Sequence, residues 1–434
     1  MILDPEHEQM PRKVLERLQL ERLQHKLREV YDKIPFYHRA FDKQRFKPDD
    51  FHNLRDLEKL PFTSKLDFRD NYPYALMATP PEQIVRIHAS SGTIGKPIIT
   101  AYTKSDIDTW TQIMARALAT AGVTKRDTIQ NAHGYGLFTG GLGFHYGAEY
   151  LGATVIPTSA GNTKRQVLLL QDLGTTVLAC TPSYALIISE TASEMGVDLR
   201  NTRLRLGVFG AEPWSEEMRK DIEERLGIRA MNMYGLTEVT GPGVAIECPY
   251  QNGLHLAEDH FLAEIIDPET GKQLSYGEKG ELVITTLTKE AHPVIRFRTR
   301  DITSLNPEPC PCGRTLIRVS RITGRTDDML VVRGVNVFPS QIESVLLAVE
   351  GVEPHYLIVI DRKHAFSSDE LEIWVEVTED VFSDEMQRMV NLEKRLRSEM
   401  ESVLGISARI KLVEPKTIAR SEGKAKRVVD RSEL

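Results

Sequence analysis

Short apolar runs alternate with segments of helical spacing between about residues 84 and 300, and this alternation constrains the fold more than any other feature. The apolar runs at 154–157, 176–179 and 206–209 have the length of buried strands. The segments at 164–173 and 215–226 have the length and charge pattern of helices. This order of elements is typical of an α/β fold class whose strands are mainly parallel.

The chain changes character after Gly324. The region beyond it has the pattern of a small α+β domain, with predicted elements at 329–332, 342–348, 356–360, 371–377, 383–404 and 408–413. A chain of 434 residues also exceeds what one ordinary core holds, so we expect at least two domains. We place an N-terminal domain at 1–324 and a C-terminal domain at 325–434.

The N-terminal segment from about 8 to 33 carries apolar residues at helical spacing, with charged residues between them. This pattern predicts an amphipathic helix that docks on the domain rather than a membrane anchor. The apolar positions are Val14, Leu18, Leu23, Leu27, Val30 and Tyr31.

The composition excludes several classes of protein. The formal net charge is −7, from 55 basic and 62 acidic residues, which gives no general attraction to nucleic acid or to an anionic membrane. No apolar run reaches the roughly 18 residues that a membrane-spanning helix needs. The N-terminus lacks the basic and apolar regions of a secretory signal. Four cysteines in this length do not make a disulfide framework, so a cytosolic location is the default expectation.

A loop rich in hydroxyls and glycines has the composition of a phosphate-binding loop. Glycines let the backbone approach a ligand, and successive N–H groups form an anion-binding concavity. The spacing is not that of the Walker motif, because Gly92 and Gly95 are too close together. Taken alone, the loop can equally be an ordinary turn. Its residues are Ser90, Ser91, Gly92, Thr93, Ile94, Gly95 and Lys96.

Further polar motifs follow predicted strands or lie at the domain boundary, where α/β proteins place ligand contacts. Tyr234 can stack on a base, Thr237 can donate to phosphate, and Glu238 can hold Mg²⁺. The alternatives are a core aromatic for Tyr234 and a solvated acid for Glu238. Asp301 can bind two ribose hydroxyls. The motifs are Gly210-Ala211-Glu212-Pro213, Tyr234-Gly235-Leu236-Thr237-Glu238, Arg296-Phe297-Arg298-Thr299-Arg300-Asp301 and Gly324-Arg325-Thr326-Asp327-Asp328.

In their order along the chain, these motifs resemble those of the adenylate-forming acyl-CoA synthetases, and more closely those of the phenylacetate–CoA ligase subfamily. The resemblance covers essentially the whole chain and implies a large α/β adenylate-forming domain with a small mobile α+β domain after it. The most specific stretches are YGLFTGGLG at 135–143, HYGAE at 145–149, FGAEPW at 209–214, GPGVA at 241–245, RGVNVFP at 333–339 and SEGKAKR at 421–427.

The resemblance implies a reaction in two steps with ATP, Mg²⁺ and coenzyme A. A substrate carboxylate attacks the α-phosphorus of ATP, and the coenzyme A thiol then attacks the acyl-adenylate and expels AMP. The loop from Ser90 to Lys96 would hold the β- and γ-phosphates, and Glu238 would bind Mg²⁺. Asp301 and Arg325 would hold the ribose. Adenine would be framed by Gly210, Ala211, Glu212 and Tyr234, with Gly235 and Thr237 completing the nucleotide contacts.

A C-terminal lysine carries the strongest implication for catalysis. By resemblance, Lys424 would bridge the carboxylate and the α-phosphate during adenylation and stabilise the transition-state charge. Asp327 would be the hinge that brings Lys424 to the phosphate loop in one domain orientation only. Apart from the resemblance, the composition of the stretch Lys424-Ala425-Lys426-Arg427 is typical of a solvated basic tail. Lys426 has a similar charge and no expected catalytic role.

Aromatic and glycine residues between 133 and 145 are candidates for an acyl pocket that accepts a flat aryl ring. Gly140, Gly141 and Gly143 leave room for the ring, and ordinary core packing is the alternative for each aromatic residue. His133 stands where closer relatives have tyrosine, so it would favour a hydroxylated or indolic acid. Ile94 removes a hydroxyl from the phosphate loop. The candidate lining residues are His133, Tyr135, Phe138, Phe144, His145 and Pro242.

A group of cysteines predicts a structural zinc site. Cys310 and Cys312 form a close pair on a turn, and Cys248 precedes His255 in another segment. Three cysteines and one histidine make a common closed tetrahedral site, which leaves no open position for chemistry. The alternatives are free cysteines in a reducing cytosol, or His260 or Asp259 in place of His255. Cys180 is most simply a small buried apolar residue.

Two other functions stay open from the sequence. The first is adenylyl transfer to a deazaflavin hydroxyl, as in synthetases that resemble this subfamily. The second is a non-catalytic nucleotide-binding relative, which an absent Lys424 would have favoured. Relatives are commonly dimers, so we expect a homodimer whose partners are a carboxylic acid, ATP and coenzyme A.

Overall fold

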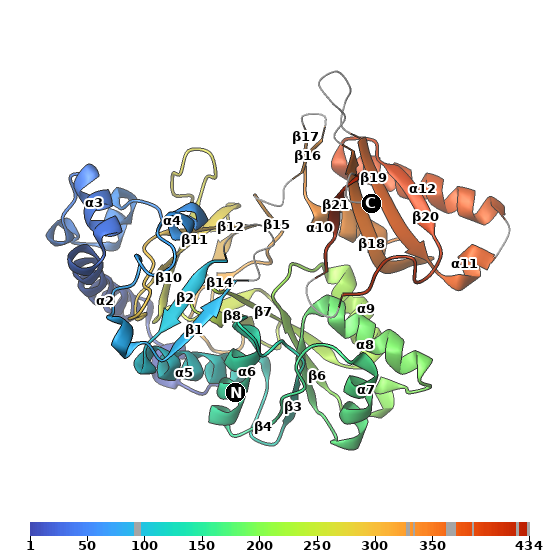
Figure 1. The fold of residues 1–434 in the computed structure, drawn as a ribbon, viewed down its shortest axis with the longest axis horizontal. Coiled ribbons are helices and arrows are strands. Elements are labelled where there is room, and N and C mark those ends of the chain that lie inside the picture. Colours follow the sequence, from blue (N-terminus) through green and yellow to red (C-terminus); the bar gives the residue numbers. More distant parts are fainter. Residues whose placement is uncertain are drawn as a thin grey trace.

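The computed structural model describes residues 1–90, 97–326, 330–332, 335–361, 370–383, 386–421 and 425–431. The N-terminal part is a large α/β body, and the C-terminal part is a smaller unit that stands beside helices α8 and α9 (Figure 1). Within those ranges, no helix combines the length and the apolar character that crossing a bilayer requires.

The central sheet is half parallel and half antiparallel. Its order is β13-β14-β9-β8-β7-β6-β5-β3-β4, and the pairs from β4 to β7 are parallel. The remaining strands continue it antiparallel, so the expectation of mainly parallel strands holds only for one half. The bounds are β3 Thr128–Asn131, β4 Thr154–Ile156, β5 Val177–Cys180, β6 Leu206–Gly210, β7 Arg229–Leu236, β8 Gly241–Glu247, β9 Leu254–Leu256, β13 Leu305–Asn306 and β14 Arg318–Val319.

Helices cover both faces of the parallel half, because successive strand residues point to opposite faces. Leu178 and Phe209 join the core under α7, α8 and α9. Val177 and Val208 join the core under α5 and α6 on the other face. The bounds are α5 Lys104–Ala121, α6 Gly140–Leu151, α7 Thr163–Asp172, α8 Pro182–Glu194 and α9 Glu216–Leu226.

Two smaller sheets complete the N-terminal part. One is the antiparallel hairpin of β1 Arg86–Ala89 and β2 Ile99–Tyr102. The other has the order β10-β11-β12-β15, and its last strand brings Arg325 beside Asp301. Its bounds are β10 Phe261–Ile266, β11 Gly280–Thr286, β12 Phe297–Thr303 and β15 Gly324–Arg325.

The N-terminal helix docks on the domain as predicted, and Leu23, Leu27 and Val30 are buried as expected, but Val14 is not. The segment forms two helices, α1 Pro5–Glu8 and α2 Arg12–Lys33, which flank Pro11. Val14 is 46% exposed, whereas Leu15 is fully buried. The departure lies in the first turn of α2, because Leu15 rather than Val14 lies on the inward face that Leu23, Leu27 and Val30 share at helical spacing.

The C-terminal unit is the predicted α+β domain with its own core. The sheet order is β20-β19-β18-β21, and the short strand β21 pairs in parallel with β18 after the chain has passed Lys424. Sequence patterns predict β18, β19, α12 and β20 but miss β17 and β21. The bounds are β16 Leu330–Val332, β17 Val335–Val337, α10 Pro339–Leu347, β18 Val352–Asp361, β19 Glu370–Val377, α11 Glu379–Ser383, α12 Met386–Leu404, β20 Arg409–Val413 and β21 Val428–Asp430.

Candidate active site and metal centre

The β1–β2 hairpin presents the candidate phosphate loop. The Ser90 N–H donates to the Ile98 carbonyl at 2.8 Å, and the Ile98 N–H donates to Ser90 Oγ at 3.1 Å. These bonds close the base of the loop with a hydroxyl that is part of the motif. The predicted phosphate ligands Ser91, Gly92, Thr93, Gly95 and Lys96 lie outside the described residues.

The end of β6 is a tight turn with a carboxylate at its tip. A Cβ on Gly210 would lie 2.3 Å from the Met233 carbonyl oxygen, so only glycine fits there. Ala211 follows with φ of 73°, an uncommon conformation for a residue other than glycine. Glu212 Oε1 accepts from the Ser183 N–H at 2.8 Å, and Oε2 accepts from the Ala425 N–H at 3.2 Å. Glu212 therefore joins the strand end to the C-terminal segment, although Lys424 itself lies outside the described residues.

Three of the predicted nucleotide residues are in direct contact. The Tyr234 hydroxyl donates to Asp301 Oδ2 at 2.6 Å. Arg325 donates to Asp301 Oδ1 at 2.8 Å across the β12–β15 pair. A Cβ on the next residue, Gly235, would lie 2.1 Å from the Gly241 carbonyl oxygen, which fixes the backbone beside Tyr234. The residues predicted for adenine and for ribose thus form one hydrogen-bonded group.

Glu238 and Thr237 lie on the turn after β7 and are buried. Burial raises the pKa of Glu238, and the positive charges of Lys65 and Arg325 oppose that rise only in part. A buried carboxylate can bind Mg²⁺ that arrives with a polyphosphate, because the metal then supplies the charge that favours ionisation of the carboxylate.

Sequence reasoning missed two residues that complete this edge. Ser183 contributes the backbone N–H that Glu212 accepts, from the first turn of α8. The Thr181-Pro182 pair directly after β5 indicates that a helix starts here, because threonine caps helices and proline suits the first helical position. Lys65, at the start of α4 Lys65–Asp70, had no such signal, because its effect on Glu238 depends on tertiary contact.

His133 lies on the loop that follows β3. Its ring stacks on Phe144, with 4.8 Å between centroids. The Nε2 atom is buried without a hydrogen-bond partner in the described part of the chain. Burial lowers the pKa of His133 to about 4, so the ring is neutral near pH 7. A neutral imidazole with an unused nitrogen can donate to or accept from a bound group.

The other candidate lining residues gather around the same loop and helix α6. A Cβ on Gly140 would lie 3.0 Å from the Phe138 ring and 3.3 Å from His133. The Tyr135 hydroxyl accepts from Asn131 at 2.8 Å and lies 3.2 Å from His145 Nδ1. Pro242 approaches α6 at Gly143, where a Cβ would lie 2.8 Å from Pro242 Cγ.

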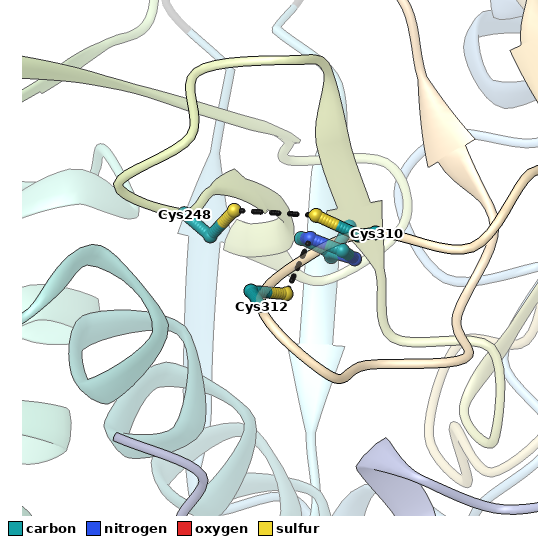
Figure 2. Close-up of side chains that lie close together, drawn as sticks. Cys248, Cys310 and Cys312 are labelled. Atoms are coloured by element: carbon teal, nitrogen blue, oxygen red, sulfur yellow. Dashed lines mark hydrogen bonds between the residues drawn. The ribbon is translucent and has the colours of Figure 1, made fainter.

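Cys248, His255, Cys310 and Cys312 form one compact cluster, as predicted from their ligand chemistry. Figure 2 shows the three cysteines of this cluster. Their ligand atoms all lie within 4.8 Å of one another. The Cys248 and Cys310 sulfurs are 3.7 Å apart, and Cys312 Sγ is 3.4 Å from His255 Nε2. A tetrahedron with Zn–S bonds of about 2.3 Å places its sulfurs about 3.8 Å apart, so the donor set fits zinc.

The alternative ligands are engaged elsewhere. Asp259 forms a buried ion pair with Arg116 at 2.6 Å, and His260 Nδ1 contacts the Thr288 hydroxyl at 2.9 Å. The cluster lies beside the N-terminal segment: Gln9 donates to the Gly313 carbonyl at 3.0 Å. The Thr315 N–H also donates to the Glu8 carbonyl at 3.1 Å. A metal at this position would therefore fix the loop that holds the N-terminus.

Two family models match the chain. The model described as AMP-binding enzyme matches residues 12–287. The model described as AMP-binding enzyme C-terminal domain matches residues 334–432.

Curated relatives match over nearly the full length. The phenylacetate-coenzyme A ligase of Thermus thermophilus is 47% identical, with 99% of both chains covered. The phenylacetate-coenzyme A ligase of Escherichia coli is 50% identical, with 96% of this chain and 94% of that protein covered.

Solved structures of 2-hydroxyisobutyryl-CoA ligase are similar in fold, and their agreement depends on the state. The postadenylation state in complex with R3-HIB-AMP superposes with a TM-score of 0.93 at 29% identity, covering 99% of this chain and 92% of that one. The thioesterification state with 2-HIB-AMP and CoA gives 0.73 at 30% identity, covering 98% and 91%. The present domain orientation is therefore closer to the postadenylation state.

Proposed function

This chain belongs to the AMP-binding enzyme family, within its phenylacetate–coenzyme A ligase branch, and from that premise we propose that its acid is an aryl acetate. It is an AMP-forming acid–thiol ligase that joins a carboxylic acid to coenzyme A at the expense of ATP. The hydrogen bond from the Ala425 N–H to Glu212 is the observation that supports the site assignment. It brings the residue that follows Lys424 to the turn after β6, where predicted nucleotide contacts lie.

Adenylation is a displacement at the α-phosphorus of ATP. A carboxylate oxygen forms the new P–O bond, the bond to the bridging oxygen breaks, and pyrophosphate leaves. We assign Lys424 to the developing charge on the α-phosphate and Glu238 to Mg²⁺. The second step is attack of the coenzyme A thiol on the acyl carbon. It releases AMP and the thiol proton.

The nucleotide contacts follow from the grouping at the sheet edge. We assign the ribose hydroxyls to Asp301, whose oxygens are oriented by Tyr234 and Arg325. We assign the adenine to Gly210, Ala211 and the Tyr234 ring. Holding the acceptor carboxylate before the nucleotide binds lowers the ordering cost of binding.

The acyl pocket is assigned to the loop after β3 and to the start of α6. The unpartnered Nε2 of His133 supports a preference for an aryl acid with a hydrogen-bonding substituent, because an isolated buried polar atom is costly until a ligand satisfies it. A simple phenyl ring would leave that atom unsatisfied.

We propose one structural Zn²⁺ at Cys248, His255, Cys310 and Cys312, supported by the donor distances. A site with four protein ligands has no open position for substrate, so its role is to fix the loop at Gly313. Asp327 remains our proposed hinge between domains at 1–324 and 325–434, and it lies outside the described residues. A homodimer and a cytoplasmic location also remain proposals.

The test is AMP formation with ATP, Mg²⁺ and coenzyme A across phenylacetate, hydroxyphenylacetates, indoleacetate, benzoate and short fatty acids. Turnover confined to aryl acetates supports the assignment. Turnover only with short fatty acids or benzoate would contradict it. Pyrophosphate release with AMP kept on a deazaflavin acceptor would instead identify an adenylyl transferase.

A further inference from the structure

We propose that Glu190 of α8 is a positioning residue that holds the Lys424 segment in the adenylation orientation and releases it for the thioester step. Glu190 belongs to the N-terminal domain and contacts two residues of the C-terminal domain, His355 and Arg420. The proposal rests on the proposed function, in which the two steps need two domain orientations.

Glu190 uses both of its carboxylate oxygens across the domain boundary. Oε1 contacts His355 Nε2, and Oε2 accepts from Arg420 Nε at 3.3 Å. The Glu190 side chain is 23% exposed and that of His355 is 8% exposed, so the contact is largely shielded from water. Removing one partner of the shielded Glu190–Arg420 pair leaves the other charge poorly solvated, which costs more than breaking a pair on the open surface.

Arg420 is fixed within its own domain before it meets Glu190. Arg420 Nη1 and Nη2 each donate one hydrogen bond to the carboxylate of Glu376, at 2.8 and 2.9 Å. Glu376 is fully buried in β19 and also accepts from the Lys416 and Ile418 N–H groups at 3.0 and 2.7 Å. The segment 416–420 is therefore a rigid part of the C-terminal domain, with Arg420 Nε left to reach Glu190.

In the sequence, Lys424 lies between two residues, Arg420 and Ala425, that each contact a carboxylate of the N-terminal domain. Arg420 precedes it and contacts Glu190, while Ala425 follows it and donates to Glu212 at 3.2 Å. Both carboxylates contact α8: Glu190 is part of that helix, and Glu212 accepts from the Ser183 N–H in its first turn. Helix α8 is thus linked, directly through Glu190 and indirectly through Glu212, to residues on both sides of Lys424 in the sequence.

The surrounding interface suits a reversible contact. A cavity of about 850 Å³ opens between α8, α9 and the C-terminal domain, lined by eight acidic and four basic residues among others. Two further ion pairs cross the same boundary, Lys416 with Glu194 and Arg225 with Glu353. Partly exposed charged groups exchange protein partners for water at small net cost, so these two ion pairs oppose domain separation only weakly.

The contact selects one orientation because its partners come from different domains. Rotation of the C-terminal domain moves His355 and Arg420 together away from Glu190. This structure superposes with a TM-score of 0.93 on a postadenylation structure and of 0.73 on a thioesterification structure. This difference supports assigning the contacts of Glu190 to the domain orientation that precedes thioester formation. Differential contacts of this kind are what bias a two-state equilibrium.

The test compares the half-reactions of Glu190→Gln, which keeps the shape of the side chain but removes its charge. We expect ATP–pyrophosphate exchange to fall by about tenfold, as for the loss of one shielded ion pair. Transfer from a synthetic acyl-adenylate to coenzyme A stays within about twofold of the wild type. Equal loss of both steps, or exchange at the wild-type rate, would overturn the proposal.

Glu393→Gln is the matched control, because Glu393 pairs at 2.7 Å with Arg397 within α12 and forms no ion pair with the N-terminal domain among the described residues. It leaves both steps unchanged. Hydrogen exchange gives a readout that does not require activity: Glu190→Gln should raise exchange at 416–421 and leave α12 unchanged. Absence of ATP–pyrophosphate exchange in the wild type with every acid would contradict the proposed function alone. Unaltered hydrogen exchange in Glu190→Gln would contradict the positioning role.

Discussion

The phenol of Tyr234 and the carboxylate of Asp301 share a 2.6 Å hydrogen bond although 67 positions separate them. Burial raises the pKa of Tyr234 well above its ordinary value, and the nearby Asp301 charge raises it further, so the hydroxyl stays protonated and donates. Arg325 holds the other Asp301 oxygen. The carboxylate is thus oriented from two sides before any ribose binds.

Tyr234→Phe removes the hydrogen bond and keeps the ring. We expect the KM for ATP to rise by about tenfold, because a hydrogen bond to a charged group contributes about 1.5 kcal/mol or more. Melting should change little, since the ring still packs. Steady-state kinetics with varied ATP test this, and an unchanged KM would show that Asp301 is held well enough by Arg325 alone.

Lys424→Ala should abolish adenylate formation while largely sparing transfer from a preformed acyl-adenylate to coenzyme A. The reason is that Lys424 is assigned to charge that develops only at the α-phosphate. ATP–pyrophosphate exchange and the isolated thioester step measure the two effects. Lys426→Ala is the matched control and should retain both. Parallel loss of both steps in Lys424→Ala would refute the assigned role.

Cys310→Ser should remove bound zinc and lower the melting temperature by at least about 5 °C, since losing a metal ligand costs several kcal/mol of folding energy. Turnover per folded molecule should change much less than stability does, because the cluster lies at the loop of Gly313 and not beside the predicted nucleotide contacts. Metal analysis and thermal melting measure these effects.

Cys180→Ala serves as the control for loss of a thiol, because Cys180 is buried away from the cluster in β5. It should keep one zinc per chain. Wild-type protein without zinc, together with unchanged melting of Cys310→Ser, would rule out the metal site.

His133→Phe should shift substrate preference by about tenfold toward unsubstituted phenylacetate, because it removes the buried Nε2 that has no hydrogen-bond partner among the described residues and adds no polar atom. The measurement is the ratio of kcat/KM for hydroxyphenylacetates to that for phenylacetate. Phe144 stacks on residue 133 in either case, so folding should survive. An unchanged ratio would show that residue 133 does not contact the ring substituent.

Local patterns predict the regular elements of this chain well. Strands β5 and β6 and helices α7 and α9 lie within one or two residues of their predicted positions. The strands are continuous buried apolar runs, and the helices have apolar residues at helical spacing. The zinc cluster is predicted by ligand chemistry, and the distances between Cys248, Cys310 and the other ligands agree with it. Such features depend on residues that are close in sequence or chemically distinctive.

Features that depend on tertiary packing were not predicted. Strands β9, β13, β14 and β21 have two or three residues each and are too short for a local period to identify. The contact of Tyr234 with Asp301 depends on how β7 meets β12, so sequence alone assigned the two residues to different parts of the nucleotide. The exposure of Val14 shows the same limit, since neighbouring apolar residues compete for the buried face.

Lys289 is a buried ammonium that neither the sequence nor the proposed mechanism explains. It is 5% exposed, and its Nζ lies 3.2 Å from the centroid of the Tyr102 ring. No hydrogen-bond partner for Nζ occurs among the described residues. Burial lowers the pKa of Lys289 from 10.5 to about 7, against a smaller opposing effect of Asp106.

This pKa predicts a specific dependence of stability on pH. Between pH 7 and 10.5 the unfolded chain holds the Lys289 proton more tightly than the folded one, so the free energy of unfolding rises with pH across this window by up to about 1.4 kcal/mol per unit. Below pH 7 both states are protonated, and the burial cost is greatest. Lys289→Met should therefore raise the melting temperature at pH 6.5, with a gain that shrinks toward pH 10. A gain that is independent of pH would mean that Lys289 keeps its proton throughout, stabilised by the Tyr102 ring.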